Sequence, residues 1–252
     1  MDSSVAWPFF LWGASWMLYV QGLIQAYNVF NDKKGRVFIL VIVGLTSAII
    51  RYCSVMAVLY FEMDQIYHCT IGALAWILMI LSSALVYSLR IKSIGGYTKH
   101  ARYINWAPWL LLIPMIPANI LASYGYYHGS EFKEVQMVCA LFLGALIAMF
   151  EIYLYVVLFL KIWEMLEYRS RVKQRLLIEM SVGLAFLIVL DIVIFFTKLF
   201  SWPLDKCLRP FSYIVRLVLV IKFFDILVDE VTKPLELEQM SIENIPHKDV
   251  EF

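Results

Sequence analysis

The chain has 252 residues, of which 62% are hydrophobic and only 16% charged, and its formal net charge is +1. A soluble globular protein has about a quarter charged residues, so this chain has too few polar side chains to surround a core in water. The composition excludes a soluble domain and indicates a protein of the lipid bilayer. The bilayer is therefore the first partner we expect, and we expect no nucleic acid among the partners.

Seven apolar segments are long enough to cross a bilayer as helices. An α-helix rises about 1.5 Å per residue and the hydrocarbon core is about 30 Å thick, so one crossing takes roughly 20 residues. Continuous apolar runs of this length argue against the alternating strands of a membrane barrel. The sequence therefore predicts an all-α membrane protein, a bundle of seven transmembrane helices over residues 1–228. These helices cover approximately residues 5–30, 37–61, 67–89, 104–124, 135–160, 176–199 and 210–228.

The basic residues near the ends of these helices predict the orientation of the bundle. Fourteen of them belong to the first, third and fifth loops and the C-terminal tail, whereas four lie on the opposite side. Because cytoplasmic loops carry an excess of Lys and Arg, we expect the N-terminus outside and the C-terminus in the cytoplasm. The fourteen are Lys33, Lys34, Arg36, Arg90, Lys92, Lys99, Arg102, Lys161, Arg169, Arg171, Lys173, Arg175, Lys233 and Lys248, and the four are Lys133, Lys198, Lys206 and Arg209.

Polar or small residues form a stripe along each of the first two predicted helices. Spacings of three and four residues place the members of a stripe on one helix face. We expect both faces to look into the bundle, the first through hydrogen bonds between helices. The stripes consist of Gln21, Gln25 and Asn28 in the first helix, and of Gly44, Ser47, Arg51 and Ser54 in the second.

Three cysteines lie near the predicted outer side of the membrane. Cys69 and Cys139 fall at the outer ends of the third and fifth helices, and Cys207 falls in the last outer loop. The outer side is oxidising for a protein of the secretory pathway, so a disulfide is one expectation. It would join Cys69 to Cys139 or Cys207, and the alternative is three thiols.

Four ionisable residues inside the predicted helices form a candidate polar core: Arg51, Glu151, Asp191 and Arg216. A charge at mid-membrane costs roughly 2.5–3.5 kcal/mol on insertion scales, so these side chains should face the bundle interior. At 1.5 Å per residue, Asp191 and Arg216 lie at the same depth, roughly 4–5 Å outside the midplane. We expect them to pair, with Arg51 close enough in depth to join them. The pair either fixes helix packing alone or binds a ligand or ion.

Glu151 continues a stripe of small residues along the fifth helix. Small residues four apart permit close approach of a neighbouring helix. By the same depth count, Glu151 and Lys222 lie on the inner side of the midplane, and we expect Lys222 to pair locally with Asp225. The stripe consists of Ala140, Gly144, Ala148, Glu151 and Tyr155.

The last segment, residues 229–252, carries seven acidic residues against two lysines and contains Pro234 and Pro246. This composition predicts a disordered cytoplasmic tail. The basic loops and this acidic tail are where we expect a cytoplasmic partner to bind. The plasma membrane and the endomembranes are both consistent with the layout.

The sequence lacks the residue patterns of an enzyme, a metal site or a bound cofactor. The four histidines, His68, His100, His128 and His247, all lie away from the centres of the predicted helices. Paired histidines for haem and a histidine-rich zinc site are therefore not expected. We also find no glycine-rich phosphate loop. We expect no catalytic residues, no metal and no cofactor.

The layout resembles that of G-protein-coupled receptors: seven helices, an N-terminus outside, a basic inner surface and an outer cysteine at the start of the third helix. This resemblance implies a receptor-like signalling protein. The residue patterns depart from the family, because residues 85–90 lack the acidic-Arg-aromatic triplet and the seventh helix lacks Asn-Pro-x-x-Tyr. A retinal protein is disfavoured, because Val218 stands one turn before Lys222 where such proteins have Asp. A small transporter or channel and a membrane scaffold or assembly factor remain as alternatives, and the ligand, a small molecule or an ion, is not identified.

Overall fold

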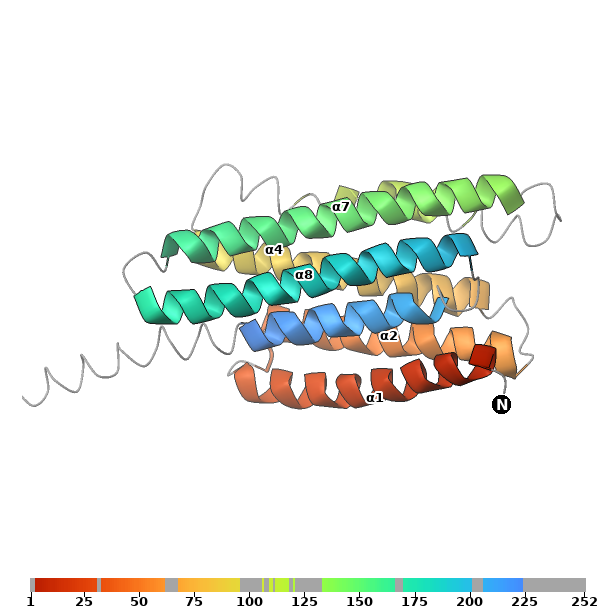
Figure 1. Ribbon diagram of the computed structural model, residues 1–252, viewed down its shortest axis with the longest axis horizontal. Coiled ribbons are helices and arrows are strands. Elements are labelled where there is room, and N and C mark those ends of the chain that lie inside the picture. The colour runs from red at the N-terminus through yellow and green to blue at the C-terminus, as the bar shows by residue number, and fades with distance from the viewer. Residues whose placement is uncertain are drawn as a thin grey trace, which may run out of the picture.

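The computed structural model describes residues 3–30, 33–61, 68–95, 106, 109–110, 112–117, 120, 133–165, 170–200 and 206–223. Every regular element within these ranges is a helix, and they lie side by side along one long axis (Figure 1). The predicted tail at 229–252 and most of the predicted helix at 104–124 lie outside the described residues. The all-helical class is therefore confirmed for the part of the chain that the structure describes.

The long apolar runs form the helices α1, α2, α4, α7 and α8, together with the helical residues 206–223, which we call the central helix. A π-helical turn, His68–Gly72, leads directly into α4. Both α7 and α8 are longer than the predicted apolar runs at each end, so residues that were predicted to lie in loops belong to these helices. The bounds are α1 Ser3–Val29, α2 Arg36–Tyr60, α4 Ala73–Gly95, α7 Lys133–Met165 and α8 Ser170–Phe200.

Three of the described helices are long and apolar enough to cross a membrane. They are Arg36–Tyr60, Thr70–Leu89 and Ile178–Thr197, and the apolar stretch of α7 is shorter, at Leu141–Val157. These lengths match the roughly 20 residues that a crossing takes. The protein is thus a helical, membrane-associated protein.

The described helices run in two opposite directions along the bundle, and one end of the bundle collects the basic residues. In Figure 1, α1, α4 and α7 end where α2 and α8 begin. The α1–α2 turn with Lys33 and Lys34 lies at this end, and α2 begins there at Arg36. We call this end the basic end, and the other end, where α1 begins, the N-terminal end.

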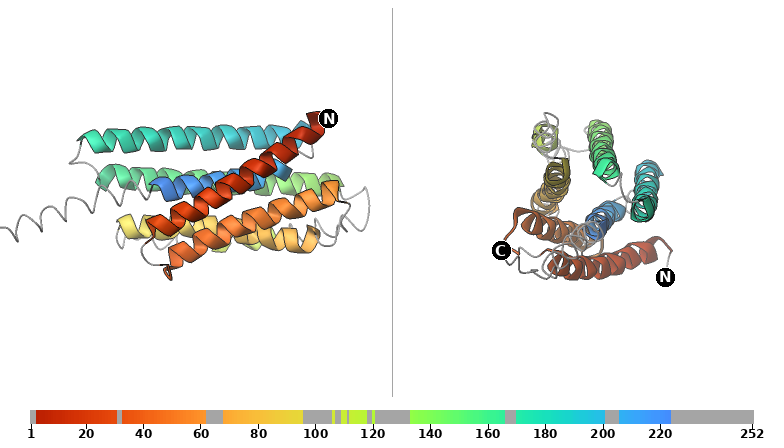
Figure 2. Two further views of the ribbon diagram at one scale, coloured as in Figure 1. Left: turned by 90° about the horizontal axis from the view of Figure 1, so that it is seen from below. Right: turned by 90° about the vertical axis from the view of Figure 1, so that its left-hand side faces the viewer.

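The central helix lies inside the bundle and contacts helices on several sides (Figure 2). Three glycines mark close approaches to it: Gly22 of α1 faces Val218, Gly44 of α2 faces Leu217, and Gly183 of α8 faces Phe223. A helix that is apolar around most of its circumference is expected to be buried, and most side chains of 206–223 are buried. A charged residue at a buried position of this helix therefore needs partners inside the protein.

The polar face of α2 looks into the bundle as predicted, at least in its first half. Gly44 and Ser47 are buried, and a Cβ added at Gly44 would lie 2.7 Å from Ser82 Oγ and 2.8 Å from Leu217 Cδ1. Arg51 and Ser54 are half-buried further along α2. Gly44 thus closes the contact of α2 with α4 and the central helix.

The prediction for α1 is wrong, because Gln21 and Asn28 are exposed and Gln25 is only half-buried. The face of α1 that packs carries Gly22 and Ala26 instead. A Cβ added at Gly22 would lie 3.0 Å from Val218 Cγ2, so this face permits closer approach than the glutamine face could. Close packing of small residues, not polarity, decided how α1 is turned.

Candidate functional site

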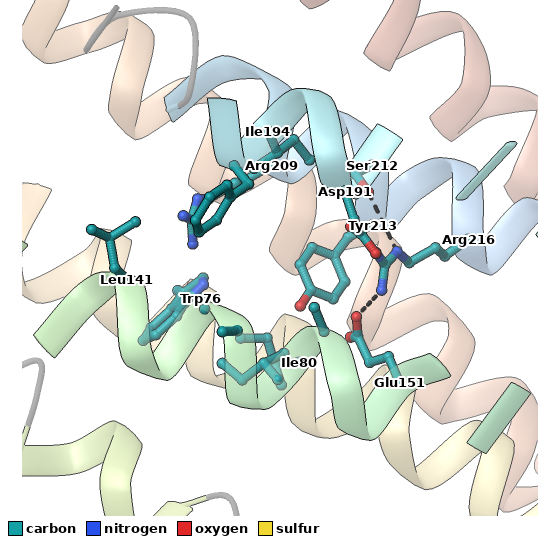
Figure 3. A pocket seen from close by; sticks show the side chains of 15 residues that line it. Trp76, Ile80, Leu141, Glu151, Asp191, Ile194, Arg209, Ser212, Tyr213 and Arg216 are labelled. Carbon is teal, nitrogen blue, oxygen red and sulfur yellow. Dashed lines mark hydrogen bonds and ion pairs between the residues drawn. The ribbon is translucent and has the colours of Figure 1, made fainter. Parts of the chain in front are cut away.

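Three charged residues from three helices meet inside the bundle. The guanidinium of Arg216, on the central helix, forms ion pairs with Glu151 of α7 through Nη1 and with Asp191 of α8 through Nη2. Its Nε donates to Ser212 Oγ at 3.3 Å (Figure 3). The planar fork of an arginine can hold two carboxylates at once, which a lysine could not do in the same geometry. We call Glu151, Asp191 and Arg216 the charged triad.

The triad is shielded from its surroundings to different degrees. The side chains of Arg216 and Glu151 are each 5% exposed, and that of Asp191 is 19% exposed. Removing one partner from a buried ion pair leaves an uncompensated charge in a low dielectric, which is costly. The three side chains therefore depend on one another.

The pair of Asp191 and Arg216 is confirmed, whereas the predicted third member was wrong. Glu151 joins the pair, and Arg51 is not among the described residues that line the cavity beside it. The depth count placed Glu151 on the inner side because it used backbone positions alone. Arg216 has a long side chain that reaches across this difference in depth. The stripe of small residues that ends at Glu151 was the available signal for its inward direction.

A cavity of about 90 Å³ lies beside the triad, between α7 and α8. Trp76 and Ile80 of α4 form part of its wall. Glu151 of α7 and Asp191 of α8 belong to its polar lining, and the other polar residues of the lining come from the central helix. That volume is large enough for several water molecules. The polar and charged lining consists of Glu151, Asp191, Arg209, Ser212, Tyr213 and Arg216.

Small residues on α7 leave the space that becomes the cavity. Gly144, Ala145 and Ala148 line it, opposite Ile194 and Phe195 of α8. A Cβ added at Gly144 would meet only Arg209, at 3.5 Å from Nη1, which is ordinary contact. The stripe was predicted to bring another helix close, but here it faces a guanidinium and open space.

The two ends of the cavity differ in charge. Figure 3 shows Arg209 near Trp76 at one end, and Glu151 with Arg216 at the other. Gly144, which contacts Arg209, precedes Glu151 by two helical turns, or about 10.5 Å along the axis. The second carboxylate oxygen of Glu151, Oε1, is buried and has no hydrogen-bond partner in the described part of the chain.

Toward the basic end, tight aromatic packing follows directly after Glu151. Tyr155, one turn further along α7, is buried and donates from its hydroxyl to the carbonyl oxygen of Met180 in α8 at 3.1 Å. Its ring lies 6.3 Å from that of Tyr87 and 6.2 Å from that of Phe223, both centroid to centroid. We call Tyr87, Tyr155 and Phe223 the aromatic plug. The α7 residues that line the cavity run from Leu141 to Glu151 and do not reach Tyr155.

Lys222 lies away from the cavity at the basic end. Its side chain is 56% exposed and its Nζ lies 3.9 Å from Glu179 Oε2 of α8. The predicted partner, Asp225, lies outside the described residues. Glu179, which lies on α8, was not among the predicted intramembrane charges.

The predicted disulfide with Cys69 is not formed, because Cys139 and Cys207 both carry thiols in the structure. Cys207 is fully buried in a cluster that includes Leu11 and Tyr52, so its side chain is directed toward α1 and α2. Cys139 is half-buried at the start of α7. The side chain of Cys69 lies outside the described part of the structure.

Among the described residues, no group of three or more His, Cys, Asp or Glu side chains could hold a metal ion. The charged cavity is thus the candidate site, built from one long arginine, two carboxylates and a second arginine. Such a lining can bind polar or charged groups by charge-assisted hydrogen bonds. The chain matches no protein-family model, and no curated protein is significantly similar to it in sequence.

Proposed function

We propose that the protein is a receptor-like signalling protein with seven transmembrane helices, whose ligand binds in the charged cavity. The proposed orientation places the N-terminal end of the bundle outside the cell or in the lumen, and the basic end in the cytoplasm. The basic residues that lie at one end of the bundle, where α1, α4 and α7 end and α2 and α8 begin, support this orientation. Ligand would reach the cavity from the outer side.

One observation carries this proposal over a transporter: the cavity is followed by the aromatic plug on its basic side. A transporter or channel needs a polar route that continues past the site to the other face. Here Tyr155 bonds to Met180, and a Cβ added at Gly183 would lie 2.9 Å from Phe223 Cζ. The helices are packed against each other where such a route would have to pass.

Signalling in this arrangement would use the triad as its mechanical element. Arg216 links the central helix to α7 and α8, so a ligand that competes for Glu151 or Asp191 changes which helix the central helix is held to. A ligand shifts such an equilibrium only by its differential affinity for the two arrangements. At the basic end α7 and the central helix end and α8 begins, and a cytoplasmic partner that binds there would respond to the change.

Flux measurements separate the receptor from the transporter. Purified wild-type protein in sealed liposomes is assayed for movement of protons, sodium, potassium, chloride and small organic solutes across the bilayer. We expect no flux above that of protein-free liposomes. Tyr155→Ala, which opens the aromatic plug, is the positive control, because flux should appear once the route past the cavity is no longer blocked. Robust solute or ion flux through the wild type would contradict the receptor proposal and favour the transporter.

A further inference from the structure

We infer that the cavity binds a small zwitterion, an ω-amino carboxylic acid, with its ammonium group at Glu151 and its carboxylate at Arg209. This inference rests on the proposed function only in using the same cavity as the ligand site. It names the ligand class from the chemistry of the two ends, and it holds whether the bound state signals or is transported.

The ammonium end of the ligand is assigned by the unused oxygen of Glu151. Oε2 is engaged by Arg216, while Oε1 is buried without a hydrogen-bond partner in the described part of the chain. A buried carboxylate oxygen that lacks a donor is costly, and the cost is recovered when a donor arrives. An ammonium group brings three N–H donors and a positive charge, and it has no acceptor that could compete.

The carboxylate end is assigned by Arg209. Its guanidinium rests against Gly144, two turns from Glu151, and Figure 3 shows it directed toward Trp76 at the far end of the cavity. A guanidinium fork matches the two oxygens of a carboxylate. The absence of a Cβ at Gly144 leaves room for this guanidinium beside the backbone of α7.

Charge balance favours a zwitterion over a simple amine or a simple acid. Two guanidinium groups, of Arg209 and Arg216, and two carboxylates, of Glu151 and Asp191, line the cavity. The ionised lining is therefore neutral, and any ligand with a net charge would bury that charge without compensation. A zwitterion adds no net charge, and it can align its dipole against that of the cavity.

The dimensions select within the zwitterions. A cavity of about 90 Å³ has room for roughly six to nine atoms of water size, at about 10–15 Å³ each, and 4-aminobutyrate has seven heavy atoms. The two ends are separated by about two helical turns of α7, or about 10.5 Å before the reach of the side chains is subtracted. Adjacent charges, as in glycine, cannot contact both ends, so several carbons must separate the ammonium from the carboxylate. 4-Aminobutyrate and 3-aminopropionate fit this description better than glycine does.

The test measures binding by the purified full-length protein in detergent. Thermal unfolding is followed with glycine, 3-aminopropionate, 4-aminobutyrate, butylamine and butyrate at matched ionic strength, because a ligand of the folded state raises Tm. Calorimetric titration then gives Kd for each compound that raises Tm. We expect 4-aminobutyrate to bind at least tenfold more tightly than butylamine, butyrate and glycine. Equal binding of butylamine or butyrate, or no binding of any zwitterion, would overturn the inference.

Two variants test which residues bind the ammonium and the carboxylate group of the ligand. Glu151→Gln and Arg209→Gln should each weaken 4-aminobutyrate at least tenfold. The matched controls are Glu179→Gln and Arg51→Gln, which change the same residue types outside the cavity and should leave Kd unchanged. If Glu151→Gln cannot be purified folded, Ala148→Leu takes its place, because it fills the cavity from α7. Undiminished binding by the cavity variants would contradict the assignment.

The same preparations distinguish failure of the ligand class from failure of the receptor. Zwitterion binding without flux in liposomes supports both proposals. Zwitterion binding with flux supports the ligand class and overturns the receptor. Absence of both binding and flux overturns the ligand class alone.

Discussion

Two glycines, Gly44 in α2 and Gly144 in α7, lie in similar stripes of small and polar residues but in opposite surroundings. Gly44 is wedged between Ser82 and Leu217, with no room for a Cβ. Gly144 lies beside the guanidinium of Arg209 at the edge of the cavity, and a Cβ added there would make only ordinary contact, at 3.5 Å from Nη1. The same sequence pattern thus produces a sealed interface on one side of the central helix and an open charged site on the other. What faces the stripe decides its role.

The largest loss of stability is expected when the cation of the charged triad is removed. Arg216→Met leaves Glu151 and Asp191 buried without their cation, and should lower the free energy of unfolding by about 3–5 kcal/mol. The measurement is unfolding of purified protein in mixed micelles with increasing denaturing detergent. The triple variant with Glu151→Gln, Asp191→Asn and Arg216→Met should recover most of the loss. A single variant within about 1 kcal/mol of the wild type would refute the mutual dependence of the triad.

Exchanging the charges of Asp191 and Arg216 should restore only part of the stability that the single changes remove. An aspartate at position 216 would stand near Glu151, which is the second partner of the native arginine. Like charges at short range destabilise a buried site. Yield and thermal stability of the exchanged protein are compared with those of each single variant. Full recovery would mean that Glu151 contributes little to holding Arg216.

A single added methyl group at Gly44 should destabilise the tight contact of α2 with α4 and the central helix. Gly44→Ala puts a Cβ 2.7 Å from Ser82 Oγ and 2.8 Å from Leu217 Cδ1, so α4 or the central helix has to shift. Overpacking of this kind typically costs about 1–3 kcal/mol. Gly144→Ala is the matched control on the open side and should stay within about 0.5 kcal/mol of the wild type. Equal losses at the two positions would remove the contrast between the two sides.

The smallest effect is expected outside both regions, at Lys222. Its side chain is 56% exposed and its ion pair with Glu179 spans 3.9 Å. Exposed pairs contribute about 0–1 kcal/mol, so Lys222→Ala should change thermal stability little and zwitterion binding not at all. A loss comparable to that of Arg216→Met would show that the basic end is coupled to the triad.

Much of the fold could be predicted from the sequence because length and apolarity report directly on membrane helices. Position along a helix also converts into depth, which is why the pairing of Asp191 with Arg216 could be predicted from their positions in the sequence. Depth alone is a backbone quantity, however, and it missed Glu151 because it takes no account of how far an arginine reaches. Arg51 had a suitable depth but lies on α2, and depth says nothing about which helices surround the triad.

The directions of the helix faces were harder to predict. The glutamine face of α1 was expected to point inward because it is polar, yet Gly22 approaches Val218 of the central helix and Ala26 is the buried side chain. The cavity could not be predicted at all, since Gly44 and Gly144 look alike until their neighbours are known. A cavity is the space that side chains leave unfilled, so its prediction requires the three-dimensional arrangement of the helices.

The central claim is that the cavity is open to the side on which the N-terminal end lies and closed toward the basic end. It is tested by Ala148→Cys in a protein whose four native cysteines are replaced by alanine, reconstituted in vesicles of known orientation. Ala26→Cys, at a fully buried position, is the unreactive control. We expect a membrane-impermeant thiol reagent to modify residue 148 from the N-terminal side alone, and 4-aminobutyrate to slow the reaction. Modification from the basic side, or equally from both sides, would contradict the account.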